Sequence, residues 1–222
     1  MKPKKLKALS KPTGRPRSFN CDKALDRALG VFWRKGYEGA SLADLTTAMD
    51  INRPSLYAAF GDKEALFRKV LDRYAEGPGS HALKALAEPT SRDVVVKLLR
   101  GSADLLTAAR GPRGCLLVQG ALTCGSAADS LRKELISRRM AGESALRQRF
   151  QRAKAEGDLP ADANPANLAR YVTTIIHGMS VQAAGGATLQ HLRHVADIVL
   201  QNWPTSSVLH KKQLGTPAIT GD

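Results

Sequence analysis

Arg53 and Tyr57 could bind a polyanion from one face of a short predicted helix, residues 53–60. Leu56 and Phe60 are four residues apart, so we expect them to bury the opposite face of that helix. A helix surrounded by solvent is normally rich in Lys and Glu, and this one carries neither. Its guanidinium and hydroxyl groups can donate hydrogen bonds to phosphates or to base edges. The residue types therefore indicate a helix that approaches another molecule closely.

A second predicted helix precedes this one and ends at a polar break. Ser41 is placed to cap its first turn, and Asp44, three residues later, would accept a hydrogen bond from the backbone of Ser41. Leu45 and Met49 then give this helix an apolar face, and Asn52 can cap the helix that follows. Two short helices joined by a tight turn, the second with a polar outer face, are the layout of a helix-turn-helix. The sequence therefore predicts that the second helix enters the major groove of DNA.

The charge of the chain points to the same kind of partner. Its 222 residues include 34 basic and 20 acidic side chains, a net charge of +14. Residues 1–17 contain seven basic side chains and no acidic one. Such an excess indicates a polyanion, either nucleic acid or an anionic membrane surface. We expect residues 1–18 to be a flexible basic arm that follows phosphates or enters the minor groove, with a solubilising tail as the alternative.

Several classes of protein do not fit the sequence. No apolar run approaches the roughly 18 residues that span a bilayer, and the basic N-terminus lacks the apolar stretch of a secretory signal. We therefore expect no membrane partner and a cytoplasmic protein, associated with the nucleoid when bound to DNA. Motifs for hydrolases, phosphate-binding loops, dinucleotide sites and zinc peptidases are missing, so we expect no enzyme, no cofactor and no metal. The alternative class is a basic helical protein that binds anionic membranes or nucleic acid without specificity.

Five stretches of sequence, taken in order, carry a resemblance to a known family. They are Gly14–Arg17, Ala28–Tyr37, Ser41–Leu45, Asn52–Phe60 and Asp62–Phe67. Together they resemble the DNA-binding domain of the TetR family of bacterial transcriptional regulators, over roughly the first third of the chain. The resemblance implies a homodimer that binds a palindromic operator of double-stranded DNA. It also implies a repressor that an unknown small-molecule effector releases.

Eight residues are expected to face DNA: Arg15, Arg17, Ser41, Arg53, Pro54, Ser55, Tyr57 and Lys63. The resemblance assigns this role to Ser41, Arg53, Ser55 and Tyr57, and Arg15 and Arg17 belong to the basic arm. Arg53 is expected to read a guanine through two hydrogen bonds, and Lys63 to meet a phosphate at the start of the next helix. Pro54 stands where the family commonly has glycine, and Ala58 and Ala59 stand where it often has His and Tyr. These departures leave the operator sequence open and favour contact with thymine methyl groups.

Beyond residue 75 the apolar pattern stays helical, with no alternating run that would predict a strand. Besides the two helices above, we expect helices over about 20–35, 62–75, 91–110, 113–125, 127–156, 164–184 and 188–203. The expected fold is all-α with about nine helices. A three-helix helix-turn-helix domain, residues 19–75, would precede a helical bundle, residues 76–204, that binds an effector and forms the dimer. We expect a mobile tail over residues 205–222.

The last two predicted helices carry more apolar residues than one core needs. They are Tyr171, Val172, Ile175, Ile176 and Met179 on the first helix, and Leu192, Val195, Ile198, Val199 and Trp203 on the second. Packing inside one chain is one explanation. The family resemblance favours another, a four-helix interface that two copies form around a twofold axis.

Seven residues of the bundle are candidates for the effector site: Cys115, Gln119, Met140, Tyr171, Ile175, His177 and Met179. Cys115 also suggests an alternative regulator that senses oxidants or electrophiles, because a helix N-terminus and the nearby Arg110 and Arg113 would favour its thiolate. A packed, apolar cysteine is the plainer explanation. We expect no disulfide between Cys115 and Cys124, since one helix would separate them by about 13 Å.

Overall fold

The computed structural model describes residues 19–109, 111–123 and 128–206. Within these ranges it contains ten α-helices, one 3-10 helix and no strand, which confirms the expected all-α class. In chain order the elements are α1 Cys21–Gly39, α2 Leu42–Met49, α3 Arg53–Phe60, α4 Lys63–Glu76, η1 Pro78–Ser80, α5 His81–Ala85, α6 Ser91–Leu106, α7 Leu116–Thr123, α8 Asp129–Ala155, α9 Pro165–Ala184 and α10 Leu189–Gln201. The expected arm, with Arg15 and Arg17, lies outside the described residues, and so do Cys124 and residues 207–222 of the expected tail.

Polar side chains begin most of these helices. Each of the following accepts a hydrogen bond from a backbone N–H of the first turn: Asn20, Ser41, Asn52, Asp62, Thr90, Asn164 and Thr188. These bonds satisfy donors that a helix start leaves without a partner. Gly36 interrupts α1 with φ 70°, a conformation that favours glycine. The regular part of α1 therefore ends near the expected residue 35.

Some boundaries differ from the expected ones. Residues 77–79 predict a bend after α4, and the structure has η1 and then α5 in that region. Neither has a side-chain cap at its start, and elements this short show too little periodicity to be recognised in a sequence. α6 ends at Leu106 and α7 begins at Leu116, because Pro112 and Gly114, with φ 87°, lie in a connecting loop. α6 therefore ends earlier, and α7 begins later, than expected.

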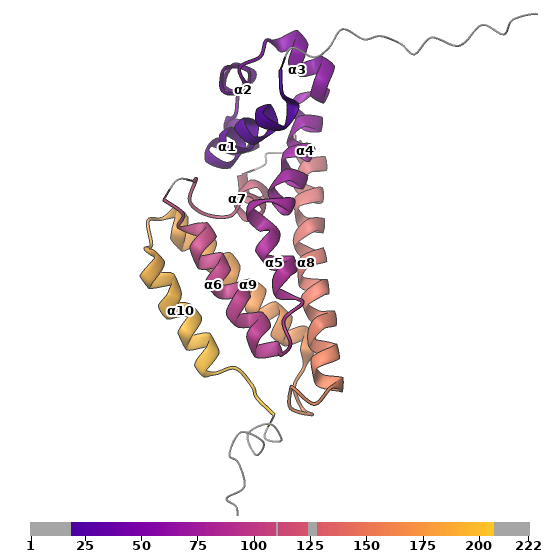
Figure 1. Cartoon of the computed structure of the whole chain (residues 1–222), viewed down its shortest axis with the longest axis vertical. Coiled ribbons are helices and arrows are strands. Elements are labelled where there is room, and N and C mark those ends of the chain that lie inside the picture. Colours follow the sequence, from indigo (N-terminus) through magenta and orange to yellow (C-terminus); the bar gives the residue numbers. More distant parts are fainter. Residues whose placement is uncertain (1–18, 110, 124–127, 207–222) are drawn as a thin grey trace, which may run out of the picture.

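The molecule has two hydrophobic cores. The first is formed by α1 to α4 and is completed by Leu116 of α7 and by Leu131 and Leu135 of α8. The second joins α5, α6, the C-terminal half of α8, α9 and α10, and includes Phe150 and Trp203 with ring centres 5.2 Å apart. Figure 1 shows α8 running along the bundle and reaching the end that carries α2 and α3. Part of the core beneath the helix-turn-helix therefore belongs to the bundle.

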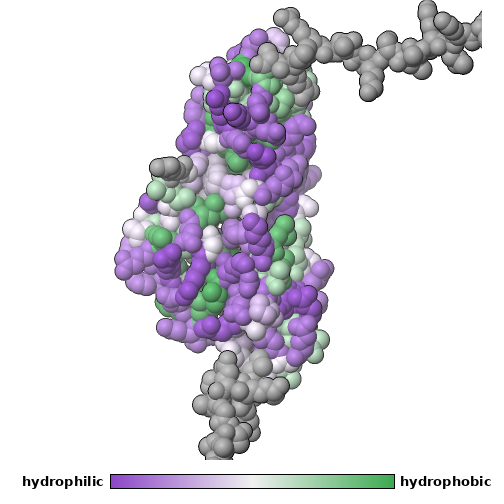
Figure 2. All heavy atoms as spheres, in the orientation of Figure 1, coloured by the Kyte–Doolittle hydropathy of each residue, from purple (hydrophilic) through white to green (hydrophobic). Residues whose placement is uncertain are grey.

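The surface differs between the two ends of the molecule. Figure 2 shows a mainly hydrophilic surface over α1 to α3 and larger hydrophobic patches over the bundle. The exposed large apolar side chains are Tyr57 on α3 and, in the bundle, Leu83, Met140, Tyr171, Val181, Val195 and Ile198. None of the described helices is both long enough and apolar enough to cross a membrane.

Candidate nucleic-acid interface

α2 and α3 meet at a tight turn and form the expected helix-turn-helix. Asp50 ends α2 in the left-handed conformation, with φ 59° and ψ 47°. Asn52 then starts α3 by accepting a hydrogen bond from the Ser55 N–H at 2.8 Å. Leu56 and Phe60 are buried in the first core. α3 is therefore held by its apolar side, which leaves its other side free.

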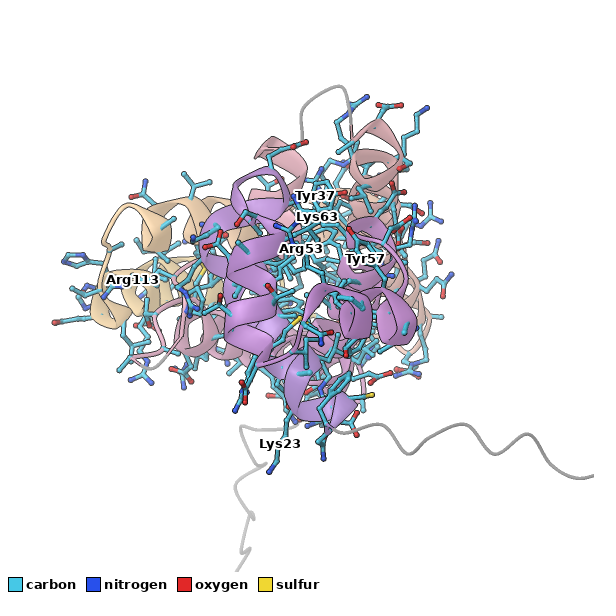
Figure 3. All side chains as sticks on the ribbon, turned by 90° about the horizontal axis from the view of Figure 1, so that it is seen from above. Lys23, Tyr37, Arg53, Tyr57, Lys63 and Arg113 are labelled. Carbon is cyan, nitrogen blue, oxygen red and sulfur yellow. The ribbon has the colours of Figure 1, made fainter. Side chains whose placement is uncertain are left out.

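The outer face of α3 offers hydrogen-bond donors to a partner. Arg53, Pro54 and Tyr57 are exposed, and Tyr57 keeps 47% of its surface open. No ion pair within the described part of the chain occupies the Arg53 guanidinium. In a view onto this end, Arg53, Tyr57 and Lys63 lie centrally, while Arg113 lies far to one side (Figure 3). The face combines one unpaired cation with an amphipathic ring, which suits contact with nucleic acid.

Ser41 differs from these residues because its hydroxyl is already engaged. The Ser41 Oγ donates to Asp44 Oδ2 at 2.8 Å and accepts from the Asp44 N–H at 3.0 Å. Lys35 also contacts Asp44, at 2.7 Å. The bonds from Lys35 and then from Ser41 lower the pKa of Asp44 to about 2. The hydroxyl proton of Ser41 is therefore used to start α2, and a phosphate would have to compete with a carboxylate for it.

Lys63 opens α4 and lies over an aromatic ring. Its Nζ is 4.4 Å from the centre of the Tyr37 ring, a cation–π contact. Burial lowers the pKa of Lys63, and the charge of Glu38 opposes this shift. The ring holds the ammonium group near a helix N-terminus, where a phosphate would also meet free backbone N–H groups. Tyr37 was not among the expected contact residues, because nothing local in the sequence relates it to Lys63.

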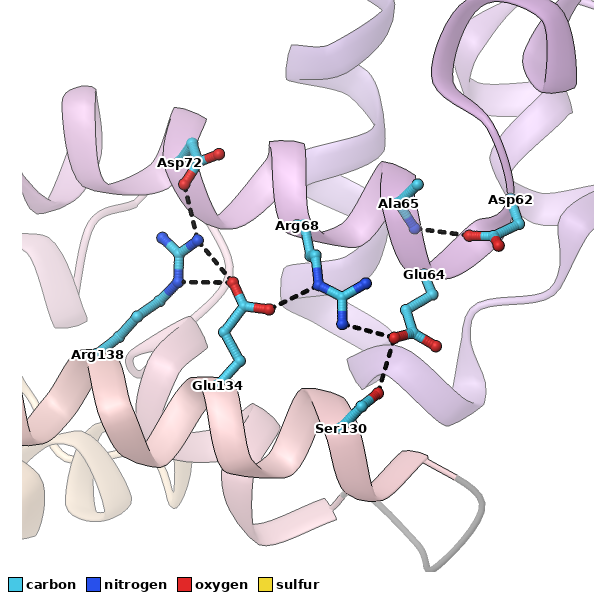
Figure 4. Close-up of polar contacts among 8 residues, drawn as sticks. All are labelled: Asp62, Glu64, Ala65, Arg68, Asp72, Ser130, Glu134 and Arg138. Atoms are coloured by element: carbon cyan, nitrogen blue, oxygen red, sulfur yellow. Dashed lines mark hydrogen bonds and ion pairs between the residues drawn. The ribbon is translucent and has the colours of Figure 1, made fainter.

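A row of polar contacts, which we call the α4–α8 ladder, ties α4 to α8 (Figure 4). In order, its members are Ser130, Glu64, Arg68, Glu134, Arg138 and Asp72. The links between the helices include Arg68 to Glu134 and Arg138 to Asp72, both at 2.7 Å. Burial would raise the pKa of Glu134, but the hydrogen bonds from Arg138 and Arg68 lower it. The ladder therefore joins the helix that follows the helix-turn-helix to the longest of the described helices of the bundle.

The loop before α7 forms a second connection. Trp33 of α1 donates its Nε1–H to the Gly114 carbonyl at 2.9 Å, and the Cys115 N–H donates to Ser180 Oγ of α9 at 2.8 Å. The Tyr74 hydroxyl of α4 donates to Cys115 Sγ at 3.4 Å. Burial, and next the neighbouring Cys115, raise the pKa of Tyr74, so its phenol keeps the proton that it donates. One loop therefore contacts α1, α4 and α9.

Cys115 packs between the two cores. It is partly buried and contacts apolar residues of both. The Arg113 guanidinium donates to the Ala187 carbonyl at 3.3 Å, and Arg110 lies outside the described residues. Among the described residues, the polar contacts of Cys115 are therefore with Tyr74, Ser180 and backbone, and Arg113 is engaged elsewhere.

The effector candidates do not gather at one place. Met140 and Tyr171 lie on the surface, Ile175 and Met179 lie in or against the second core, and Cys115 and Gln119 lie next to Gly114. His177 is partly buried on α9, and the positive charge of Arg139 on α8 adds to the burial that lowers the pKa of His177. His177 differs from the other six candidates in one respect. Its charged neighbour, Arg139 of α8, forms no ion pair with any described residue.

The apolar residues of α9 and α10 divide between core and surface. Buried in the second core are Val172, Met179, Leu192, Val199 and Trp203, so packing within one chain accounts for them. Exposed are Tyr171 and Val181 on α9, and Val195 and Ile198 on α10. With Thr174 and Gly178, which are also exposed, Tyr171 and Val181 repeat at helical spacing and form one line. We call this line the α9 stripe.

Comparison with known proteins covers both domains. A family model described as "Bacterial regulatory proteins, tetR family" matches residues 24–70, and one described as "Tetracyclin repressor-like, C-terminal domain" matches residues 94–199. The HTH-type transcriptional repressor ComR of Escherichia coli (strain K12) is 35% identical over 198 residues, which span 88% of this chain and 94% of ComR. The HTH-type transcriptional repressor BdcR of the same strain is 30% identical, over 84% of this chain and 90% of BdcR.

A solved structure shows the same arrangement of helices. The TetR family transcriptional regulator CifR, in complex with 26-base-pair double-strand operator DNA, superposes with a TM-score of 0.82 and 43% sequence identity. That match covers 86% of this chain and 100% of the CifR chain. Sequence, fold and the helix-turn-helix agree, and this chain belongs to the TetR family of bacterial regulatory proteins.

Proposed function

We propose that two copies of this chain bind a palindromic operator and repress transcription, with α3 of each copy in the major groove. The observation that carries this proposal is the outer face of α3, where Arg53 and Tyr57 project from a capped and packed helix. The names of ComR and BdcR as repressors, and the operator complex of CifR, support the same role. A protein with this role acts in the cytoplasm.

Within this proposal, residues of α3 divide between reading bases and holding phosphates. Arg53 reads a guanine, because its planar fork matches the two acceptors that guanine presents in the major groove. Pro54 places an apolar ring next to Arg53 and suits a thymine methyl group. Ser55 and Tyr57 hold phosphates and so set the position of α3.

Residues outside α3 extend the proposed contact. Lys63 meets a phosphate at the N-terminus of α4, where the Tyr37 ring supports its ammonium group. Arg15 and Arg17 reach the minor groove beside the site, as Arg-bearing arms do in other helix-turn-helix proteins. Ser41 acts mainly by starting α2, since its hydroxyl is bonded to Asp44.

Residues 19–75 are the proposed DNA-binding domain, and residues 76–204 the proposed effector and dimer domain. One short recognition helix contacts few base pairs, whereas two helices about 34 Å apart read both halves of a palindrome. We assign the dimer interface to the exposed residues of α9 and α10, which include the α9 stripe.

An effector bound in the bundle would release the operator by favouring a dimer whose α3 helices no longer match the half-site spacing. The α4–α8 ladder and the bond from Trp33 to Gly114 are the proposed mechanical links. A ligand shifts such an equilibrium only by the difference between its affinities for the two states. Near-complete release therefore requires a difference of about 5.5 kcal/mol.

The proposal is tested by selecting preferred sites from randomised duplexes and measuring affinities by fluorescence anisotropy at several salt concentrations. Arg53→Ala is expected to weaken binding to the selected site by about 1–3 kcal/mol and to relax its sequence preference. Tyr57→Ala and Lys63→Ala are expected to weaken binding to all duplexes, and Lys63→Ala, which removes a cation, should lower the salt slope by about one.

Arg92→Ala is the matched control for Arg53→Ala. Arg92 is an exposed arginine on α6, in the bundle, so the control removes the same charge away from α3. An equal loss of selected and random affinity in Arg53→Ala would contradict base reading by Arg53. Failure of the selection to enrich any duplex would contradict the proposed function itself.

A further inference from the structure

The buried face of α8 is interrupted halfway along the helix. Leu135 is buried in the first core and Leu146 in the second, but residues 136–145 include no buried residue. Gly142 lies seven residues after Leu135 and four before Leu146, so the helical repeat puts it on the same face as both. Gly142 is nevertheless exposed, and a side chain there would meet no atom within 4 Å. An open space therefore lies beside α8, between the two cores.

Arg139 lies one turn before Gly142 on α8 and has unused hydrogen-bonding capacity. Its Nε is buried, and no group among the described residues accepts a hydrogen bond from it. Glu143, one turn later on α8, is placed to pair with Arg139 but is bonded to Arg170 of α9 at 2.8 Å instead. The neighbouring Arg138, by contrast, is bonded to two carboxylates. Leaving a buried guanidinium donor without an acceptor is costly, so the position favours an anion.

His177 approaches Arg139 from the facing helix α9. Burial, and next the positive charge of Arg139, lower the pKa of His177, while Glu143 acts in the opposite direction. Thr173 of α9 donates a hydrogen bond to Glu143 of α8 at 3.4 Å, and Arg139 lies one turn before Glu143 while His177 lies one turn after Thr173. Since α8 and α9 run antiparallel, this register places the two nitrogen-donor side chains beside each other, and the carboxylate of Glu143 is held by Arg170. An oxyanion between Arg139 and His177 would accept hydrogen bonds from both and would offset their mutual repulsion.

We propose that the space beside Gly142 binds a small organic carboxylate, held by the guanidinium of Arg139 and by His177. A planar guanidinium matches a carboxylate with two parallel hydrogen bonds. The inference rests on the proposed role of the bundle as the effector domain and gives that effector a chemical class.

The test titrates the full-length protein, without DNA, with benzoate, phenyl phosphate and benzamide. These probes share one ring and differ in their polar group. Calorimetry measures binding, and the imidazole NMR signal of His177, assigned with His177→Gln, reports on the site. Benzoate is expected to bind saturably and to shift that signal, and benzamide is not. Arg139→Gln is expected to weaken benzoate binding roughly 10-fold or more, because a charge-assisted contact is lost.

Arg147→Gln is the matched control, since Arg147 is an exposed arginine of the same helix. No saturable benzoate binding, equal binding of benzoate and benzamide, or equal effects of the two arginine variants would overturn the proposal. Binding of phenyl phosphate without benzoate would overturn the choice of a carboxylate. Operator affinity is measured separately. A chain that binds an operator but not benzoate contradicts the anion site alone, and one that binds benzoate through Arg139 but no DNA contradicts the proposed function alone.

Discussion

Arg53 and Ser41 are both exposed at the DNA-binding end, but hydrogen bonds inside the protein give them different tasks. Arg53 forms no ion pair with the described residues, so its guanidinium group is available to donate hydrogen bonds to a base. The Ser41 hydroxyl both donates to and accepts from Asp44, which completes a capping box. The family resemblance assigns both residues to DNA contact. The bonding leaves the Arg53 guanidinium available for the proposed contact and commits the Ser41 hydroxyl to starting α2.

Ser41→Ala should therefore lower stability more than intrinsic DNA affinity. Loss of a helix cap costs about 1 kcal/mol, which corresponds to a fall in Tm of about 2–4 °C for a chain of this size. Circular dichroism would measure the Tm, and anisotropy at a temperature where the variant is fully folded would measure the affinity. Ser55→Ala is the control for the Tm measurement, because Ser55 uses its backbone N–H, and not its hydroxyl, in the cap of α3. An unchanged Tm with a large loss of affinity would assign Ser41 to direct contact.

His81 and His177 should make stability depend on pH. Burial lowers the pKa of both; for His81 the bond to the Pro78 carbonyl and the charge of Asp104 oppose the shift, and for His177 Arg139 adds to it. Below the ordinary histidine pKa near 6.5, the unfolded chain binds more protons than the folded one, so the free energy of unfolding falls as pH falls. Urea unfolding at pH 7.5 and 5.5 should show this fall.

The matched variant is His81→Gln with His177→Gln, which should reduce the difference between the two pH values. His194→Gln, at an exposed position of α10, is the control. Carboxylates with lowered pKa, such as Asp44, titrate at more acid pH and contribute little in this window. A double variant with the full pH difference would show that other groups cause it.

At the scale of helices, local signals made the DNA-binding end predictable. Ser41, Asn52 and Asp62 are caps that the sequence shows directly, and the apolar spacing of α2 and α3 fixes their buried faces. The contact between Lys63 and Tyr37 depends on how α1 packs against α4, so no local pattern reveals it. Oppositely charged residues four positions apart, such as Glu64 and Arg68, predict an ion pair within one helix. They do not predict the bonds between α4 and α8, such as Arg68 to Glu134.

The bundle was less predictable because periodicity identifies an apolar face without identifying what covers it. Val172 and Val199 read as candidates for a dimer interface and are buried in the second core of one chain. Met140 and Tyr171 read as effector contacts and lie on the surface. The gap in the buried face of α8 needs the coordinates, since a glycine in a helix does not show by itself that nothing packs against it.

Glu134→Gln should weaken the join between α4 and α8. It removes the charge that Arg68 and Arg138 share, and such partly exposed pairs contribute up to about 1 kcal/mol each. We expect a fall in Tm of a few degrees at low salt and a smaller fall at about 1 M salt, where charges are screened within about 3 Å. Glu156→Gln is the control, because its pair with Arg152 at 3.6 Å stays within one helix end. A loss of Tm independent of salt would indicate a packing effect instead.

At the scale of the whole molecule, the two functions lie at different places along its length. The recognition helix lies at one end, while the exposed residues of α9 and α10 lie on the bundle (Figure 1). An interface there would hold two copies by their bundles and leave both α3 helices free to meet one duplex. The charge of +14 adds attraction to any DNA, and the paired α3 helices supply selectivity.

Val181→Glu and Ile198→Glu, made singly and together, should therefore separate the dimer. Both side chains are exposed in one copy, at 54% and 59%, so a charge there should not disturb the fold of that copy. In a closed apolar interface the same carboxylate would lose its water without gaining a partner. Sedimentation velocity should show a shift from dimer to monomer, with the helical circular dichroism retained. Operator affinity should fall towards that for random DNA, a loss of about 10³-fold or more, because one half-site is no longer read.

Leu83→Glu is the matched control for both variants. Leu83 is as exposed, at 68%, but lies on α5, away from α9 and α10. It should leave both the mass and the operator affinity unchanged. If Leu83→Glu separated the dimer and the other two did not, the interface would involve α5, and the α9 stripe would need another partner. If all three variants kept the mass of the native protein, the interface would lie elsewhere. A monomer that still bound a palindrome tightly would mean that α3 and the basic arm suffice without a second copy.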